Sequence, residues 1–487
     1  MPDRPNIVIV NPDSYRGDVL GHLGNVGAHT PNVDALIRDG GVSYANAFAQ
    51  NPVCTPSRCS FMTGWYPHVH GHRSMKNMLA AHEPHLLKVL QREGYHVWWG
   101  GKNDLVAVED KSDYLEHCDT KYVPKDCPGD YHRPSPLPPD DPRRGVFFEG
   151  VMRKHGQGPV FHDRDRAHVE GALGFLAEQD GDHPFCVYLP LGAPHPPYRV
   201  EKEFYDLIDP NRLPPRWPVP ENDHPALDDL REAYGAGNVT EKEWTDLKRV
   251  YYGMCAKVDQ FFGRVIETLK ETGTYDKTLI IFLSDHGDFA GDYSLPEKTH
   301  MSLQDSLIHV PFVIKPPTSV SVEQGIRMHL VELVDMTATI YDLLGIDPGY
   351  DAFGRSLMDS LQGEDSEVRE AVFAEVGARK GERAFNNPDV NDLPPDSFYP
   401  VQCSVMWPVH DAGSYAVSCR THDFKYVRRG YSDRHELYDL RHDPGELRNV
   451  SGTPEHAETE RELERKLLDF FMTTADVLPH DQDSRRV

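Results

Sequence analysis

Positive charge is scarce in this sequence. Its 487 residues include 51 lysines and arginines against 77 aspartates and glutamates, which gives a formal net charge of −26. No block of basic residues stands out against this background. A polyanionic partner would be repelled, which argues against nucleic acid and anionic membranes as partners. An anionic substrate would need a local pocket of cationic side chains.

Long apolar runs and paired cysteines are also missing. No run approaches the length that spans a membrane, and Met-Pro-Asp-Arg-Pro leads directly into a short apolar segment without the pattern of a signal peptide. We therefore expect no membrane partner and a cytoplasmic location. The eight cysteines form no C-x-x-C pairs of the kind that bind zinc, and a chain of this length requires no disulfide framework.

The pattern that is present is typical of a large globular enzyme. Hydrophobic residues make up 39% of the chain and aromatic residues 10%, which is enough for a sizeable core. Continuous apolar runs at residues 7–10, 185–189 and 278–283 are typical of strands buried on both faces of a parallel sheet. Residues 163–179 and 244–272 predict helices directly before the second and third runs. The sequence therefore predicts an α/β domain.

The pattern changes near residue 371. Short alternating runs at residues 371–376, 415–420, 424–428 and 436–440 predict a small antiparallel sheet, with a helix at 455–473 packed on it. We therefore divide the chain into a catalytic α/β domain, residues 1–370, and a smaller C-terminal α+β subdomain, residues 371–487. A long insert at residues 379–407 carries three aromatic residues, and loops of this kind often shape specificity.

The segment at residues 51–72 organises the rest of the chain. Pro56 suits the first position of a helix, and Gly64 can end that helix. Cys54 would then lie at the positive end of the helix, with Arg58 projecting from the same face. We expect a thiol placed there to be acidic and reactive. The alternative is a half-buried cysteine at an ordinary junction between a turn and a helix.

Two acidic residues follow buried strands. Asp13 comes shortly after the first apolar run, and Asp285 comes shortly after the third. Open α/β sheets bind ligands at the carboxyl ends of their parallel strands, and a buried carboxylate is costly without a cation beside it. We predict that both residues are metal ligands. For Asp13, a helix-capping role is the alternative.

The run C-T-P-S-R-x-S-x-x-T-G, which starts at Cys54 and is followed by Tyr66-Pro67, resembles the signature of the type I sulfatases. These are formylglycine-dependent members of the alkaline-phosphatase-like superfamily. The resemblance implies their fold, a large mixed, mostly parallel sheet flanked by helices. It also implies that a maturation enzyme oxidises Cys54 to formylglycine in the unfolded chain. One hydroxyl of the hydrated aldehyde would attack sulfur, and the second would then expel sulfate by re-forming the aldehyde.

Two further motifs resemble the metal site of this family. The block after the first strand resembles one that supplies two adjacent ligands, here Asp13 and Ser14, and the serine offers only a hydroxyl where a stronger ligand is usual. The run S-D-H-G-D at residues 284–288 resembles the second metal motif, with His286 in place of the frequent asparagine. The resemblance implies a Ca²⁺ ion, or Mg²⁺ or Mn²⁺, whose expected ligands are Asp13, Ser14, Cys54, Asp285 and His286.

Other segments resemble the family's sulfate-binding pocket. Lys102 matches a lysine that contacts sulfate, and Asp104 stands where a histidine is common. Asp104 could pair with Lys102 and orient it, accept a hydrogen bond from one hydroxyl of the hydrated aldehyde, or merely cap the next segment. His195, in the run P-H-P-P-Y, is a candidate to protonate the leaving oxygen, and a structural role is the alternative. A second sulfate-binding lysine is expected before a strand, where we prefer Lys298 to His300 on residue type. The expected anion-binding and catalytic residues are thus Arg58, Lys102, Asp104, His195, Lys298 and His300.

Three hypotheses follow from these patterns. The first is a sulfatase that hydrolyses the sulfate ester of a small molecule or a saccharide. The second is a phosphonate monoester or phosphodiester hydrolase of the same superfamily, which the departures at Ser14 and Asp104 favour. The third is a non-catalytic anion-binding protein in which Cys54 is never oxidised. The sequence leaves the sulfated alcohol and the oligomeric state open.

Overall fold

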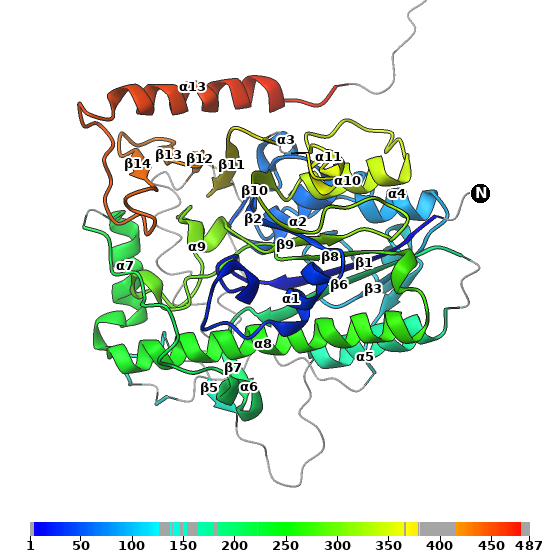
Figure 1. The fold of residues 1–487 in the computed structure, drawn as a ribbon. Coiled ribbons are helices and arrows are strands. Elements are labelled where there is room, and N and C mark those ends of the chain that lie inside the picture. The colour runs from blue at the N-terminus through cyan, green and yellow to red at the C-terminus, as the bar shows by residue number, and fades with distance from the viewer. Residues whose placement is uncertain are drawn as a thin grey trace, which may run out of the picture.

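Parallel strands form the centre of the molecule. A computed structural model (Figure 1) describes residues 4–125, 137, 138, 140–146, 150–152, 164–179, 183–221, 223–364, 367–377, 379 and 415–478. Its main sheet has the order β10-β2-β9-β8-β1-β6-β3-β4. The strands are β1 (Asn6–Asp13), β2 (Val42–Phe48), β3 (His96–Gly100), β4 (Thr120–Tyr122), β6 (Phe185–Pro194), β8 (Thr278–Leu283), β9 (Phe312–Lys315) and β10 (Gly325–Glu332). Strand β9 is antiparallel to β2 and β8, whereas the other neighbouring pairs are parallel. The predicted mixed, mostly parallel sheet is confirmed.

Helices cover both faces of this sheet. In Figure 1, α8 and α5 run below the sheet, and α2, α4 and α10 lie above it. The helices of this part are α1 (Pro31–Arg38), α2 (Cys54–Thr63), α3 (Pro67–His70), α4 (Leu86–Arg92), α5 (Arg164–Ala177), α6 (Lys202–Leu207), α7 (Pro225–Tyr234), α8 (Glu241–Glu271), α9 (Asp305–Ile308), α10 (Asp335–Leu344) and α11 (Met358–Leu361). A two-stranded sheet of β5 (Gly150–Met152) and β7 (Arg199–Glu201) lies beside α6 and α8.

The alternation of side chains along β1 explains why helices have to cover both faces of the sheet. Val8 and Val10 belong to the core that contains the apolar face of α8, whereas Ile7 and Ile9 belong to the core that contains α2, α4 and α10. Successive side chains of a strand point to opposite faces, so a strand that is apolar throughout has to be covered twice. All eight residues of β1 are buried. The helices predicted at 163–179 and 244–272 correspond to α5 and α8.

A smaller antiparallel sheet follows in the C-terminal part. Its strands are β11 (Val372–Val376), β12 (Ala416–Arg420), β13 (Phe424–Arg429) and β14 (Glu436–Asp439), and α13 (Ala457–Thr474) packs on it (Figure 1). The predicted antiparallel sheet and helix are confirmed. The division into domains at residue 370 stays a prediction. The insert at 379–407, apart from residue 379, lies outside the described residues.

Strand β11 also contacts the loop that precedes Cys54. The Glu375 amide donates to the carbonyl oxygen of Gln50 at 2.8 Å, and the Asn51 side-chain amide donates to the Glu375 carbonyl at 2.7 Å. The C-terminal sheet therefore closes over the segment that leads into α2. Among the helices that the structure describes, none combines the length and the apolar character needed to cross a bilayer.

Candidate active site

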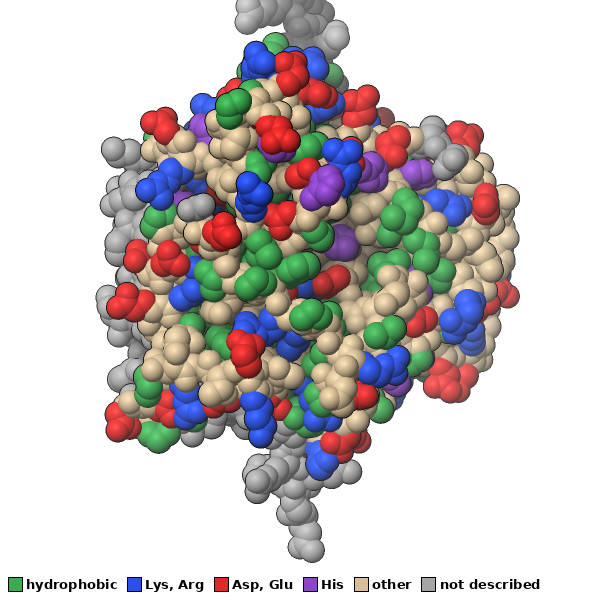
Figure 2. Space-filling model, turned by 60° about the vertical axis from the view of Figure 1, so that its left-hand side comes forward, with side chains coloured by type: hydrophobic (Ala, Val, Ile, Leu, Met, Phe, Trp, Pro, Cys, Tyr) green, Lys and Arg blue, Asp and Glu red, His purple; other side chains and the backbone are tan. Residues whose placement is uncertain are grey.

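The carboxyl ends of the central strands meet at one side of the molecule. Strand β1 runs from the N-terminus at the right of Figure 1 towards the left. Figure 2 brings that left-hand side forward and shows a face that is hollowed near its middle, with histidine side chains in and above the hollow. Acidic and basic side chains are interspersed around it. The site therefore forms where open α/β sheets bind ligands.

Helix α2 places Cys54 at this end of the sheet. The helix begins at Cys54 itself, so Pro56 lies in its first turn, and it ends at Gly64, which adopts the left-handed conformation with φ 76°. The Ser57 hydroxyl donates to the carbonyl oxygen of Asp285 at 2.5 Å, which fixes the start of the helix to the end of β8. All ten residues of α2 are buried.

Four predicted metal ligands converge here. Ligand atoms of Asp13, Cys54, Asp285 and His286 lie within 4.8 Å of one another. The Cys54 sulfur is 3.2 Å from Nε2 of His286 and 3.5 Å from Oδ1 of Asp13. Nδ1 of His286 lies 2.7 Å from the Gly287 carbonyl oxygen, so Nδ1 carries the proton and the neutral ring presents an unprotonated Nε2 to the cluster. Burial lowers the pKa of His286, which favours this neutral form.

Arg58 and Ser14 hold the two carboxylates of this cluster. Nε of Arg58 is 2.8 Å from Oδ2 of Asp285, and its NH2 group is 2.9 Å from Oδ2 of Asp13. The Ser14 amide donates to Asp285 at 3.2 Å, and the Ser14 hydroxyl donates to Asp13 at 3.0 Å. The Arg58 guanidinium is therefore bound to carboxylates that the sequence did not pair with it. Ser14 lies beside the four clustered residues, and its role as a ligand stays a prediction.

The expectation of an acidic thiol at Cys54 is wrong. Burial, and next the carboxylate of Asp13, raise the pKa of the Cys54 thiol above its ordinary value, although Lys102 and Lys298 act in the opposite direction. The positive end of a short helix does not compensate for full burial beside negative charge. An unmodified Cys54 is thus a poor source of thiolate.

Lys102 and Asp104 form an ion pair next to this cluster. Nζ of Lys102 is 2.7 Å from Oδ2 of Asp13, 2.8 Å from Oδ2 of Asp104 and 3.6 Å from the Cys54 sulfur. Burial alone would lower the pKa of Lys102, but Asp104 and Asp13 raise it well above its ordinary value, so the ammonium group stays charged. Of the three roles weighed for Asp104, the structure shows the pairing with Lys102, and the hydrogen bond to the hydrated aldehyde stays a prediction.

His195 and Lys298 approach the same place from two other loops. His195 follows β6, and its Nδ1 donates to the carbonyl oxygen of Pro196 at 2.6 Å. Burial, and next the charge of Lys298, hold the pKa of His195 well below its ordinary value. The charge of Lys298 also acts on the pKa of Cys54 and of His286, which places Lys298 within reach of the cluster. His300 lies two residues further along the chain and is partly exposed.

Two residues beside these side chains received no role from the sequence. Asp288 and Tyr198 are buried and joined by a hydrogen bond of 2.8 Å. Both residues belong to motifs quoted above, S-D-H-G-D and P-H-P-P-Y. Their place in those motifs is the sequence feature that could have identified them. The contact itself joins residues 90 positions apart.

The carboxylates around Cys54 are paired with cationic side chains before any ion binds. Asp13, Asp104 and Asp285 face Arg58 and Lys102, and the positive charge of Lys298 also acts on Cys54. A divalent cation would make the group positive. Such a cation would therefore create the local cationic pocket that an anionic substrate needs against a net charge of −26.

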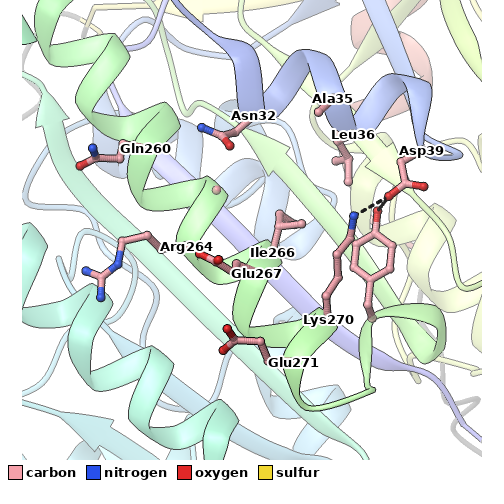
Figure 3. A pocket seen from close by; sticks show the side chains of 12 residues that line it. Asn32, Ala35, Leu36, Asp39, Gln260, Arg264, Ile266, Glu267, Lys270 and Glu271 are labelled. Carbon is pink, nitrogen blue, oxygen red and sulfur yellow. Dashed lines mark hydrogen bonds and ion pairs between the residues drawn. The ribbon is translucent and has the colours of Figure 1, made fainter.

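A separate groove of about 540 Å³ lies between α1 and α8 (Figure 3). Lys270 and Tyr275 both donate to Oδ2 of Asp39 at 2.8 Å across it. Tyr275 precedes β8, whereas Asp285 follows it. The groove therefore lies at the opposite end of that strand from Cys54 and is no part of the candidate site.

A family model described as Sulfatase matches residues 5–346. The chain belongs to the sulfatase family. This sulfatase is 26% identical to arylsulfatase K of Bos taurus over 99% of the chain and 85% of that protein. It is 27% identical to the choline-sulfatase of Rhizobium meliloti over 93% of the chain and 83% of that protein. The predicted family is confirmed, and the chain is a hydrolase of the sulfuric ester class, which argues against a non-catalytic anion-binding protein.

The fold is also similar to that of a solved structure. The sulfatase superimposes on the phosphonate monoester hydrolase of Agrobacterium radiobacter with a TM-score of 0.75 and 24% identity, over 97% of the chain and 96% of that chain. The alkaline-phosphatase-like architecture expected from the sequence is thereby confirmed.

Proposed function

We propose that this sulfatase hydrolyses the sulfate ester of a small molecule or saccharide, with residue 54 acting as a formylglycine hydrate. The observation that supports it is the convergence of Cys54, three further polar side chains and Lys102 at the carboxyl ends of β1 and β8. The proposal requires a maturation enzyme that converts Cys54 before the chain folds. A cytoplasmic location stays a prediction.

The cluster around Cys54 fits a divalent cation, and we propose Ca²⁺, with Mg²⁺ or Mn²⁺ as alternatives. Asp13 and Asp285 are fully buried, and buried carboxylates favour a bound cation. His286 adds a nitrogen, which is less usual for Ca²⁺ than an oxygen donor. When bound, the cation would neutralise an anionic substrate and lower the pKa of the attacking hydroxyl.

The side chains around the cluster would hold the ester and move its protons. Lys102 lies 3.6 Å from the atom that residue 54 presents and is held there by two carboxylates, so it is positioned to bind both the hydrate and an ester oxygen. His195 has its Nδ1 proton committed to Pro196 and its pKa held low, so Nε2 is unprotonated at rest. Nε2 would take up the proton of the attacking hydroxyl and pass it to the leaving oxygen. Lys298 adds positive charge next to His195.

A phosphonate monoester or phosphodiester hydrolase is the second candidate. The pairing of Asp104 with Lys102 favours it, because this aspartate stands where sulfatases commonly have a histidine and adds negative charge beside the anion site. Both candidates use the same aldehyde and metal. They differ in the ester that is turned over fastest.

The proposal is tested with protein co-produced with a maturation enzyme. We expect mass spectrometry of the peptide at residues 51–58 to show formylglycine, and aryl sulfate to be hydrolysed faster than aryl phosphate, aryl phosphodiester or aryl phosphonate. Cys54→Ser should lose turnover because serine lacks the second hydroxyl. Cys59→Ser is a matched control, since Cys59 is a buried cysteine of the same helix that faces the Leu105 carbonyl. Full activity with unmodified Cys54 would refute the mechanism, and preference for a phosphorus ester would favour the second candidate.

A further inference from the structure

The two loops that carry His195 and Lys298 are joined by one tyrosine. Tyr198 lies three residues after His195, is 3% exposed and contacts two acceptors with its hydroxyl. The single hydroxyl proton is shared between these two acceptors, Oδ2 of Asp288, at 2.8 Å, and the carbonyl oxygen of Pro296, at 2.5 Å. Pro296 is two residues before Lys298. The hydroxyl therefore connects the histidine loop to the backbone of the lysine loop.

Asp288 connects the same two loops to the end of β8. Its Oδ1 accepts the amide of Lys298 at 2.6 Å and the amide of Phe289 at 2.9 Å, while Oδ2 accepts the Tyr198 hydroxyl. Asp288 is fully buried. One carboxylate thus binds the main chain of Lys298 directly and the His195 loop through Tyr198. Bonds to a charged acceptor are among the stronger hydrogen bonds of a protein interior.

We propose that Tyr198 and Asp288 are positioning residues that hold His195 and Lys298 at a fixed separation around the substrate anion. This inference rests on the proposed function, in which both side chains face the ester. Both residues act through the backbone of the loops that carry His195 and Lys298. Displacing a binding group by a fraction of an ångström from its working geometry is enough to slow a reaction.

The test is a double-mutant cycle between Tyr198→Phe and Lys298→Ala. Phenylalanine keeps the ring that packs edge-on against Tyr251 at 6.2 Å and removes only the hydroxyl. We expect Tyr198→Phe to lower kcat/KM about tenfold and to weaken binding of inorganic sulfate about fivefold. In the Lys298→Ala background the same change should cost less than about twofold, because the group that Tyr198 positions is gone.

The control is Tyr275→Phe, which removes a hydroxyl that also donates to a carboxylate at 2.8 Å, at the opposite end of β8. Its kcat/KM and sulfate affinity should match those of the wild type, while its melting temperature should fall about as much as that of Tyr198→Phe. Asp288→Asn can keep the amide bonds and the tyrosine contact, so it should retain activity that Asp288→Ala loses. This pair decides the question if Tyr198→Phe does not fold.

Additive losses in the cycle, or equal activity in Tyr198→Phe and Tyr275→Phe, would overturn the inference. The cycle is run with whichever ester the wild type hydrolyses fastest, so a preference for a phosphorus ester would refute the sulfatase proposal alone. If no ester is hydrolysed, the proposed function fails, and the sulfate-binding cycle still decides whether Tyr198 acts through Lys298.

Discussion

Asp104→Asn tests whether the ion pair between Asp104 and Lys102 contributes to catalysis. The alternative is that the replacement of the family's histidine by Asp104 has no effect on function. Nζ of Lys102 lies 2.8 Å from Asp104 and 2.7 Å from Asp13. Two unit charges at such a distance attract by about 6 kcal/mol at an effective dielectric constant of about 20. Asparagine leaves a neutral acceptor of the same shape, and Asp13 remains. The net loss should therefore be about 1–2 kcal/mol, which corresponds to a fall in kcat of about fivefold to thirtyfold.

Turnover should suffer more than binding. The Lys102 ammonium lies 3.6 Å from the sulfur of Cys54. Its orientation should therefore affect the stability of the transition state, in which the nucleophile attacks the ester, more than it affects substrate binding. Removing the negative charge of Asp104 also relieves repulsion of the bound anion, which partly restores substrate affinity. We expect KM to change by less than about threefold while kcat falls.

Steady-state kinetics on the best ester of the panel measures this split. Glu116→Gln is the matched control, because it changes the net charge by the same amount at an exposed position, and its kinetic constants should equal those of the wild type. An unchanged kcat in Asp104→Asn, or an improved affinity alone, would show that the aspartate has no catalytic role.

Three further predictions concern the metal, a buried ion pair, and Asp259 of α8, whose carboxylate accepts the amides of Asn32 and Val33 at the start of α1. Asp285→Ala should lose both bound metal, measured by elemental analysis, and turnover; retention of both would remove Asp285 from the site. Burial raises the pKa of Asp259 from 3.8 to about 6, so its stabilising contribution is present below about pH 4 and is lost, by roughly 3 kcal/mol, as the pH rises through about 6. Asp259→Asn should therefore gain stability relative to the wild type across that interval in urea unfolding, and a constant difference would contradict the argument. Arg369 is paired with buried Glu332 at 3.0 Å and with buried Asp335, so Arg369→Met should lower the free energy of unfolding by about 3–5 kcal/mol; a loss below about 1 kcal/mol would contradict a stabilising pair.

Local sequence patterns predict the framework of the site well. The run at 278–283 is β8, residue for residue, because a continuous apolar run between polar segments has few alternatives in an α/β protein. Asp13 and Asp285 could then be placed together, since the ends of parallel strands share one edge. Strand β2 was missed because Ser43 and Asn46 interrupt its apolar pattern.

The electrostatics of the site could not be predicted in the same way. Near Cys54 the local feature, a helix start, points to an acidic thiol, but burial and a carboxylate 41 residues away decide the sign of the shift. The partners of Arg58 are also distant, at separations of 45 and 227 residues. Contacts of this range are set by the tertiary fold and leave no trace in the spacing of the sequence.

The burial of α2 sets a time limit on the chemistry proposed for Cys54. An enzyme that must read this segment unfolded can act only until the segment is covered, and part of the cover is β11, where Glu375 binds Asn51 from 324 residues further along. A ribosome that adds about 5–20 residues per second needs roughly 15–65 s to make that stretch. Glu375, which covers the loop before Cys54, is therefore not yet made during this interval. The proposed conversion of Cys54 would therefore have to be complete before β11 is made and covers this loop, and the fraction of active enzyme should rise when translation alone is slowed.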